Sequence, residues 1–357
     1  MRIAIVLGTR PEIVKFSPII RECIRLEQDF FVLHTGQHYS YNMDRVFFEQ
    51  LELPEAEYNL NVGRGTHGEQ TGKMLIDIEK VLLKEKPDIV LVEGDTNTVL
   101  AGALSAAKVG IKVGHVEAGL RSYDRQMPEE INRILADHCS DLLFSPTRKA
   151  AAILLNEGIP RDKIFVTGNT IVDAVFHNIE MAKKKAPKRS RLDSEKKDYV
   201  VVTIHRQENV DNKERFQRIL KGLEIVHRDL DCPVIYTIHP RASKRLKEFR
   251  LEPRGVKLIR PLDYLSFLSL ESNARLILTD SGGVQEEACI LRVPCVTLRY
   301  NTERPETLDV GSNVLAGTDP SMILEKVHIM LSKKRRWKNP FGDGKAGQRI
   351  LDVLKMN

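Results

Sequence analysis

Short runs rich in β-branched residues alternate with longer amphipathic segments along almost the whole chain, and this alternation restricts the fold most. In the first half it predicts strands at residues 3–7, 30–35, 89–93, 112–116, 142–145 and 164–167, and helices at 11–25, 69–84 and 98–108. In the second half it predicts strands at 199–204, 234–238, 256–259, 276–279 and 295–298, and helices at 213–227, 262–271 and 284–291. Strands that are apolar throughout and alternate with helices form parallel sheets covered on both faces. The sequence therefore predicts an α/β protein with two doubly wound domains in series.

The length agrees with two domains, because 357 residues exceed what one hydrophobic core usually serves. Between the two halves, residues 183–191 are strongly basic, lack apolar periodicity and contain Pro187. We interpret them as an exposed segment at the domain junction, with a basic docking patch as the alternative. The tail at 347–355 has the pattern of a short amphipathic helix.

Composition excludes several classes of protein. No run approaches the ~18 consecutive apolar residues of a membrane helix, and the N-terminus enters a strand without the apolar region of an export signal. The five cysteines are scattered without a C-x-x-C pair, which argues against a disulfide framework or a zinc site and favours a reducing cytoplasm. A net charge of +6 suits an anionic ligand but is too small to indicate nucleic acid.

Polar residues follow six of the predicted strands, at 9–12, 94–96, 117–119, 205–208, 239–240 and 280–283. In open parallel sheets the ligand lies beyond the carboxyl ends of the strands. One polar strand end would be unremarkable, but six of them across two domains favour a ligand cleft between the domains.

Two of these strand ends have features of a phosphate site. Ser281, Gly282 and Gly283 directly precede a predicted helix, whose free amides can bind an anion. Arg10 lies beside Pro11, which suits a first helical position, and Lys15 follows about one turn later.

Other ligand motifs are missing. There is no G-x-G-x-x-G after the first strand, so a dinucleotide fingerprint is not expected. The acidic pair Asp229 and Asp231 precedes a strand, at the wrong end of the sheet for a metal, and reads as a helix-to-strand turn. No H-E-x-x-H or clustered histidine pattern occurs, so we expect no metal site.

The titratable candidates at the strand ends and in the helix after them are Asp95, Glu117, Glu129, Glu130 and His205. Carboxylates that share a cleft raise one another's pKa and can supply an acid and a base near neutrality. Each of them taken singly could equally be a helix cap or a surface acid.

These segments, in their order along the chain, resemble the non-hydrolysing UDP-N-acetylglucosamine 2-epimerases. The resemblance rests on Gly-Thr-Arg-Pro-Glu at 8–12 with Lys15, Glu-Gly-Asp-Thr at 93–96, His-Val-Glu-Ala-Gly-Leu-Arg at 115–121 and Pro-Glu-Glu-x-Asn-Arg at 128–133. It continues with Thr-Gly-Asn-Thr at 167–170, His-Arg-x-Glu-Asn at 205–209, Asp-Ser-Gly-Gly-x-Gln-Glu-Glu at 280–287 and Thr-Glu-Arg-Pro-Glu at 302–306. It covers the chain nearly from end to end.

The resemblance implies two Rossmann-like domains of the glycosyltransferase-B type with the active site in the interdomain cleft. It implies an N-terminal domain at 1–172, joined by the last helix at 346–357, and a UDP-binding domain at 173–345. The implied reaction eliminates UDP from UDP-N-acetylglucosamine to give 2-acetamidoglucal, then adds UDP back with C2 inverted, giving UDP-N-acetylmannosamine. No nicotinamide or metal cofactor is implied, and we expect a cytoplasmic homodimer that supplies sugars for surface polysaccharide or glycoconjugates and binds neither nucleic acid nor membrane.

Carried over residue by residue, the resemblance implies three sets of functional residues. The catalytic set is Asp95, Glu117, Glu129 and His205. The UDP-binding set is Arg10, Lys15, Leu262, Phe267, Ser281, Gly282, Gly283, Glu287 and Arg304. Some bacterial members bind a second UDP-N-acetylglucosamine as activator, and the residues that resemble this site are Gln37, His38, Arg64, Arg206 and His239.

The sequence departs from the family pattern at a few positions. Gln207 replaces a second arginine, Ser40 replaces a second glutamine of the activator site, and the stretch 121–128 is short. Three alternatives remain: a hydrolysing UDP-N-acetylglucosamine 2-epimerase, a glycosyltransferase of the same fold, and a nucleotide-sugar-binding regulator without catalysis. Turnover of UDP-N-acetylglucosamine without any acceptor would separate an epimerase from a transferase.

Overall fold

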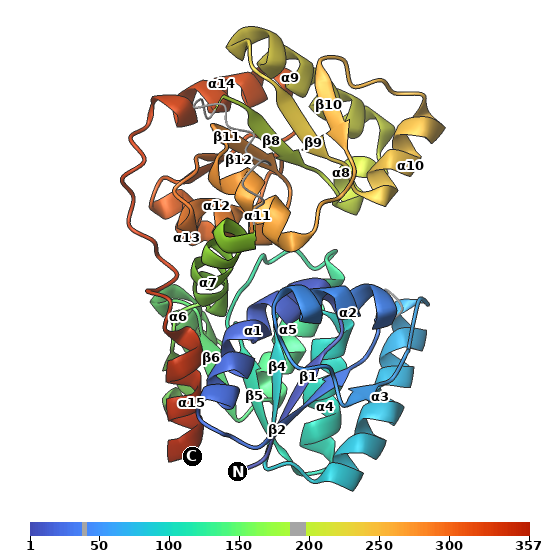
Figure 1. Cartoon of the computed structure of the whole chain (residues 1–357), viewed down its shortest axis with the longest axis vertical. Helices are drawn as coiled ribbons and strands as arrows, with labels where there is room; N and C mark the ends of the chain where they lie inside the picture. The colour runs from blue at the N-terminus through green and yellow to red at the C-terminus, as the bar shows by residue number, and fades with distance from the viewer. Residues whose placement is uncertain (38–40, 186–197) are drawn as a thin grey trace. The chain divides into compact units, whose positions relative to one another are not determined.

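The computed structural model describes residues 1–37, 41–185 and 198–357. The chain forms two compact units: Met1–Phe176 together with Phe341–Asn357, and His177–Pro340. Each unit contains a parallel β-sheet with interleaved helices (Figure 1), as the sequence predicts. The basic segment lies at the end of α7, where Lys183 and Lys184 are exposed, while its remaining residues from 186 onward fall outside the described part.

The first unit is built on a seven-stranded sheet of order β3-β2-β1-β4-β5-β6-β7. Its strands are β1 (Ile3–Leu7), β2 (Phe30–His34), β3 (Tyr58–Asn59), β4 (Ile89–Glu93), β5 (Lys112–Val116), β6 (Leu142–Ser145) and β7 (Ile164–Val166). Its helices are α1 (Arg10–Arg25), α2 (Tyr41–Gln50), α3 (His67–Glu85), α4 (Asn97–Lys108), α5 (Pro128–Cys139), α6 (Arg148–Asn156), the start of α7 (Thr170–Lys185) and α15 (Ala346–Met356).

Helices cover both faces of this sheet. Alternate residues of β1 and β4, among them Val6 and Val92, pack against α3, α4 and α5 in one hydrophobic cluster. On the opposite face α1 and α15 lie side by side (Figure 1), and a Cβ at Gly347 would lie 3.1 Å from the backbone of Pro18. The C-terminal helix is therefore part of the first unit.

The second unit is built on a six-stranded sheet of order β10-β9-β8-β11-β12-β13. Its strands are β8 (Val200–Thr203), β9 (Val234–Thr237), β10 (Val256–Ile259), β11 (Leu276–Thr279), β12 (Cys295–Thr297) and β13 (Asn313–Leu315). Its helices are α8 (Gln207–Val210), α9 (Lys213–Leu230), α10 (Pro240–Phe249), α11 (Tyr264–Ser272), α12 (Gly282–Ile290), α13 (Pro305–Asp309) and α14 (Pro320–Ser332).

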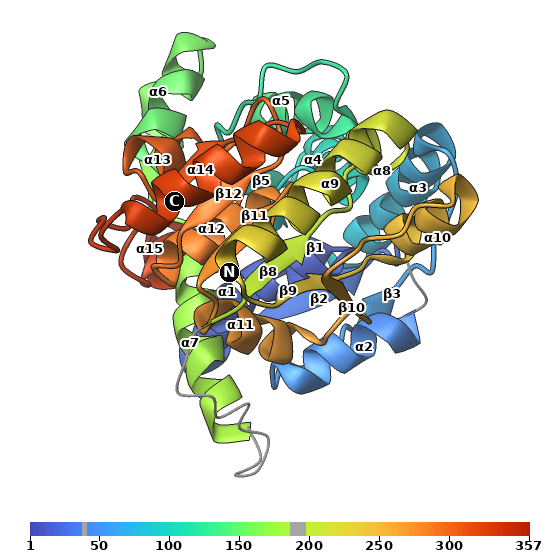
Figure 2. The same cartoon turned by 90° about the horizontal axis from the view of Figure 1, so that it is seen from above.

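The two faces of the second sheet are also covered. Val202, Tyr236 and Leu278 face a core that includes residues of α9, α10 and α14. Helices α9 and α14 lie side by side there, as Figure 2 shows from above. Val201 and Ile277 face the opposite way, toward α12 and Phe267 of α11.

Each strand that the sequence predicts is present and ends within one residue of the prediction. The short strands β3 and β13 are not predicted from the sequence and are only partly buried. Helix α12 begins at Gly282 rather than at 284, because Ser281 is its N-cap and accepts a hydrogen bond from the amide of Val284. Helix α11 begins after Asp263, which caps it in the same way.

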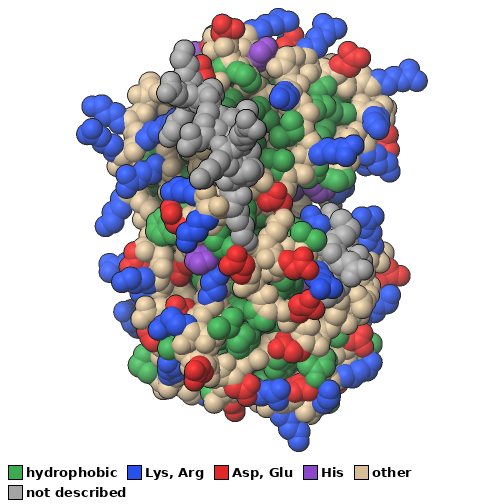
Figure 3. All heavy atoms as spheres, in the orientation of Figure 1, with side chains coloured by type: hydrophobic (Ala, Val, Ile, Leu, Met, Phe, Trp, Pro, Cys, Tyr) green, Lys and Arg blue, Asp and Glu red, His purple; other side chains and the backbone are tan. Residues whose placement is uncertain are grey.

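On the face shown in Figure 3, basic side chains are interspersed with acidic ones. The five cysteines are free thiols, and four of them are buried. None of the helices in the described part of the chain combines the length and the apolar character needed to cross a membrane.

Candidate active site

Three neighbouring strands of the first unit, β1, β4 and β5, bring their polar carboxyl ends to one edge of the sheet. Glu117 follows β5 directly and has a φ of +71°, a left-handed conformation that costs energy in a residue other than glycine. Its carboxylate accepts a bond from Lys15 Nζ at 2.5 Å and from Asn169 Nδ2 at 3.0 Å, both on Oε1. This predicted catalytic residue is therefore buried and held by two donors.

Arg10 is the first residue of α1, and its guanidinium lies over the ring of Phe47, 5.0 Å from the ring centroid. The helix start is fixed by a capping box in which Glu12 accepts from the amides of Gly8 at 2.6 Å and Thr9 at 2.9 Å. Glu12 also accepts from the Thr96 hydroxyl, so it joins the loops after β1 and β4. Burial raises the pKa of Glu12 to about 7, against the lowering effect of these bonds.

Asp95 follows β4 and pairs with Arg133, while Asn132 donates to its backbone carbonyl at 3.0 Å. Both partners lie on α5, so this helix determines where the Asp95 side chain lies. Glu129 is in the first turn of α5 and is half-exposed. The structure therefore brings two predicted catalytic carboxylates onto the region formed by the β4 loop and α5.

Glu130, another sequence candidate, has a structural role. It is buried, accepts bonds from the backbone amides of Ser122 and Tyr123, and pairs with Arg133 at 2.6 Å. These bonds fix the loop after β5 to the start of α5.

Two buried groups near this edge were not assigned from the sequence. Glu93 accepts from the Thr170 hydroxyl at 2.5 Å; burial, with a smaller effect of Glu117, raises its pKa well above the usual value. His115 binds Asp137 through Nδ1 at 2.6 Å and the carbonyl oxygen of Gly94 through Nε2 at 2.9 Å. Burial opposes the charged form of His115, but Asp137 outweighs it and the pKa of His115 lies above its usual value.

The second unit has Asp280 at its centre, directly after β11. Its buried carboxylate accepts from the amides of His205 and Arg206, each at 3.0 Å, and lies 3.0 Å from Nδ1 of His205. Burial opposes ionisation, but His205 and these donors outweigh it and keep the pKa of Asp280 below its usual value. The His205 side chain is 42% exposed, so one edge of the ring is held by Asp280 and the rest is accessible.

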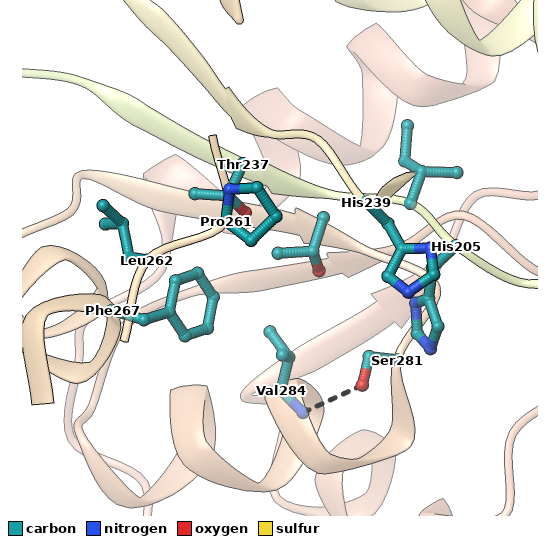
Figure 4. Close-up of a pocket in the computed structure, with 10 residues that line it drawn as sticks. His205, Thr237, His239, Pro261, Leu262, Phe267, Ser281 and Val284 are labelled. Carbon is teal, nitrogen blue, oxygen red and sulfur yellow. Dashed lines mark hydrogen bonds between the residues drawn. The ribbon is translucent and has the colours of Figure 1, made fainter. Parts of the chain in front are cut away.

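A cavity of about 230 Å³ adjoins His205 (Figure 4). Its walls are Thr203, Ile204, His205, Thr237, His239, Pro261, Leu262, Phe267, Ser281 and Val284. Leu262, Pro261 and the Phe267 ring lie at one end, and the two histidines and Ser281 lie at the other. The cavity thus has an apolar end suited to a flat ring and a polar end at the start of α12.

The other residues of the predicted UDP-binding set lie on or near α12. Gly282 and Gly283 are its first two residues, and the carboxylate of Glu303 is so close to Gly282 that a Cβ would not fit there. Glu287 is buried one turn further on, and Arg304 pairs with buried Glu286 at 2.8 Å. In this unit the predicted residues Leu262, Phe267 and Ser281 line the cavity itself.

The predicted activator residues are distributed over both units. Gln37 is buried and its Oε1 accepts from the amide of Thr98 at 3.0 Å, whereas Arg64 is exposed. Arg206 pairs with Glu303 at 2.9 Å, and the ring of His239 lies 6.0 Å from that of His205. His38 lies outside the described residues.

Two of the missed residues had a signal in the sequence. Thr9-x-x-Glu12 is a capping-box spelling before a predicted helix, and Asp280 is the first residue after a predicted strand. The contact between His115 and Asp137 had no local signal, because β5 and α5 come together only in the tertiary fold. Among the described residues, no three His, Cys, Asp or Glu side chains converge as ligands for a metal ion.

Each unit contains a parallel sheet with polar strand ends, and the second unit has a cavity that fits a flat ring beside the N-terminus of α12. These features define a nucleotide-binding protein of the glycosyltransferase-B-like class. Residues 22–355 match the family model described as UDP-N-acetylglucosamine 2-epimerase. The chain belongs to this family.

Relatives of known name and structure agree with this assignment. The UDP-N-acetylglucosamine 2-epimerase of Methanocaldococcus jannaschii is 60% identical over 99% of both chains. Its crystal structure with UDP-GlcNAc and UDP superimposes with a TM-score of 0.95 at 59% identity, covering 100% of both chains. The Neisseria meningitidis UDP-GlcNAc 2-epimerase bound to UDP-GlcNAc gives a TM-score of 0.92 at 34% identity, again over 100% of both chains.

Proposed function

We propose that this protein epimerises UDP-N-acetylglucosamine reversibly at C2 and yields UDP-N-acetylmannosamine without hydrolysing it. The observation that carries the proposal is the pair of acids at adjacent strand ends, Asp95 and Glu117, each held by a cation. The names of the relatives in M. jannaschii and N. meningitidis, and the UDP-GlcNAc in their structures, support the choice of substrate.

The chemical problem is the weakly acidic proton on C2 of the sugar. A protein carboxylate takes this proton as the bond from C1 to the diphosphate oxygen breaks, and the products are 2-acetamidoglucal and UDP. UDP then adds back to C1 while a proton returns to C2 on the opposite face. Asp95, Glu117 and Glu129 divide proton removal and return between them.

The departing diphosphate needs compensation for its negative charge. Asp280 binds Nδ1 of His205, so Nε2 of that ring is directed to the ligand. The amides at the start of α12 and the cations Arg10, Lys15 and Arg304 add to this stabilisation.

The uridine belongs in the cavity of the second unit. The Phe267 ring packs on the uracil, the backbone of Leu262 reads its edge, and Glu287 accepts from the ribose hydroxyls. The cavity of about 230 Å³ with an aromatic ring at its apolar end supports this assignment.

We further propose that Gln37, His38, Arg64, Arg206 and His239 bind a second UDP-N-acetylglucosamine as activator. The protein acts as a cytoplasmic homodimer and supplies a sugar for surface polysaccharide or glycoconjugates. The half-exposed apolar residues Ile131 and Leu135 on α5 are consistent with a protein partner, and sedimentation equilibrium tests the dimer.

The decisive experiment incubates the protein in deuterated water without any acceptor, in one sample with UDP-N-acetylglucosamine and in a second with UDP-N-acetylmannosamine, and follows proton NMR. We expect both UDP-sugars in one equilibrium mixture from either starting epimer, with deuterium at C2. Free N-acetylmannosamine as the main product would assign the hydrolysing class. Absence of turnover without an acceptor would favour a transferase or a non-catalytic regulator.

A further inference from the structure

The segment 167–170 (Thr-Gly-Asn-Thr) connects β7 to α7, whose first residue is Thr170, and the reaction proposed above gives this segment no role. Gly168 has a φ of +89°, and a Cβ there would lie 3.2 Å from the carbonyl oxygen of Phe341. The next amide, that of Asn169, donates to the same oxygen at 2.8 Å. The start of α7 is thus fixed to the segment that leads into the C-terminal helix.

This anchoring directs the Asn169 side chain toward Glu117. Its Oδ1 accepts from the amide of Ile171 at 3.1 Å, and its Nδ2 donates to Glu117 Oε1 at 3.0 Å. A carboxylate only accepts hydrogen bonds, so the network determines which way the amide points. Asn169 is 2% exposed, which keeps water from replacing this bond.

Other charged groups face Glu117 from the neighbouring elements. Lys15 of α1 donates to Glu117 Oε1 at 2.5 Å, the same oxygen that Asn169 contacts, and the carboxyl group of Glu93 on β4 also interacts electrostatically with Glu117. Burial raises the pKa of Glu93 well above its usual value, which favours the neutral form of this carboxyl. Glu117 therefore has one cation and one neutral donor on the same oxygen.

We infer that Asn169 is a positioning residue for the reaction: together with Lys15 it fixes the Glu117 carboxylate in its reactive orientation and stabilises the ionised form. The inference rests on the proposed function. Glu117 has a strained backbone and a flexible side chain, and the two donors on Oε1 restrict rotation of its carboxylate. A misplaced general base loses rate steeply, by about 100-fold for 1 Å.

The test compares one substitution at two sites. Asn169→Asp keeps the shape and the acceptor for Ile171, but it removes the donor and places a second carboxylate beside Glu117. Asn212→Asp is the matched control, because Asn212 caps α9 by accepting from Arg215 at 3.0 Å and aspartate caps as well. Asn169→Ser, whose hydroxyl is too short to donate to Glu117 and which adds no charge, serves as the second variant if Asn169→Asp folds poorly.

We measure kcat and KM for epimerisation from pH 5 to 9, and the Kd of UDP by calorimetry. In Asn169→Asp we expect kcat to fall about 10- to 100-fold. The acidic limb of its kcat–pH profile should move to higher pH by roughly one unit, because a neighbouring carboxylate opposes ionisation of Glu117. Asn169→Ser should also lower kcat, but the acidic limb of its pH profile should move less. The Kd of UDP should stay within about twofold of the wild-type value in both Asn169 variants. Asn212→Asp should match the wild type in kcat, pH profile and Kd.

The outcomes separate the inference from the proposed function. A folded wild type that does not epimerise overturns the proposed function, and the inference with it. An active wild type with unchanged kcat and pH profile in both Asn169 variants overturns the inference alone. Loss of UDP binding in proportion to kcat would also overturn it, because the residue would then serve binding rather than orientation.

Discussion

The ammonium of Lys15 lies 2.5 Å from Oε1 of Glu117, although 102 positions separate the two residues. Their side chains are 12% and 4% exposed, so the pair is largely shielded from water. From sequence, Lys15 was expected to bind UDP; in the structure its ammonium neutralises the carboxylate proposed for proton transfer.

Removing one member of this pair should destabilise the first unit. Lys15→Met leaves a buried carboxylate without its cation, and we expect a loss of about 3 kcal/mol in the free energy of unfolding. Adding Glu117→Gln should recover part of that loss, because the uncompensated charge disappears. Hydrogen exchange of the amides in β1 and β4 measures the effect, with Lys80→Met, from an exposed ion pair, as the control. Strictly additive effects in the double variant would contradict the coupling.

Substitutions that remove titration while keeping shape test the catalytic set. Asp95→Asn, Glu117→Gln, Glu129→Gln and His205→Asn should each lower turnover by about 100-fold or more. UDP binding should persist in the three carboxylate variants, because those groups act on the sugar. Asp77→Asn and His138→Asn change exposed groups of the same type and should remain active. A variant with near-normal turnover would exclude its residue from the set.

Phe267 should contribute to nucleotide affinity and not to phosphate affinity. Stacking of a base on an aromatic ring is worth about 1–3 kcal/mol, so Phe267→Ala should weaken UDP binding roughly tenfold or more. Titration calorimetry with UDP and with inorganic pyrophosphate separates the two contributions. Phe249→Ala, outside the cavity, is the control. An equal loss for both ligands would mean that Phe267 does not contact the uracil.

Glu12 should make the stability of the first unit depend on pH. Its pKa is raised from 4.5 in the unfolded chain to about 7, so the folded protein binds this proton more tightly. Protonated Glu12 therefore contributes its full stabilisation to the free energy of unfolding below pH 4.5, and this stabilisation is lost as the pH rises to about 7. At 1.36 kcal/mol per pH unit the loss amounts to about 3 kcal/mol.

Glu12→Gln removes this titration. Urea unfolding of both proteins between pH 4.5 and 8, with hydrogen exchange in β1 as the readout, should show the wild type losing stability relative to the variant as the pH rises. A constant difference across this range would mean that Glu12 is ionised throughout in the folded state.

Local sequence signals were sufficient for all strands but β3 and β13. Continuous apolar, β-branched runs such as Ile3–Leu7 and Ile89–Glu93 are stable as buried parallel strands. Both runs form such strands at the predicted residues. Capping residues also act locally: Thr66 and Glu69 determine where α3 begins, as their spacing indicates. Because parallel strands end at a common edge, the polar residues after them could be assigned to a site from sequence alone.

What the sequence determined by itself was therefore most of the strands, several of the helices, the α/β class and the edge where polar side chains gather. Only the tertiary structure decided which of those side chains meet: Lys15 with Glu117, Arg133 with Asp95, and Asn169 with Glu117. The physical reason is range. Capping and periodicity act within a few residues, whereas these pairs join segments that come together only when the sheet assembles and burial makes an unpaired charge too costly to leave.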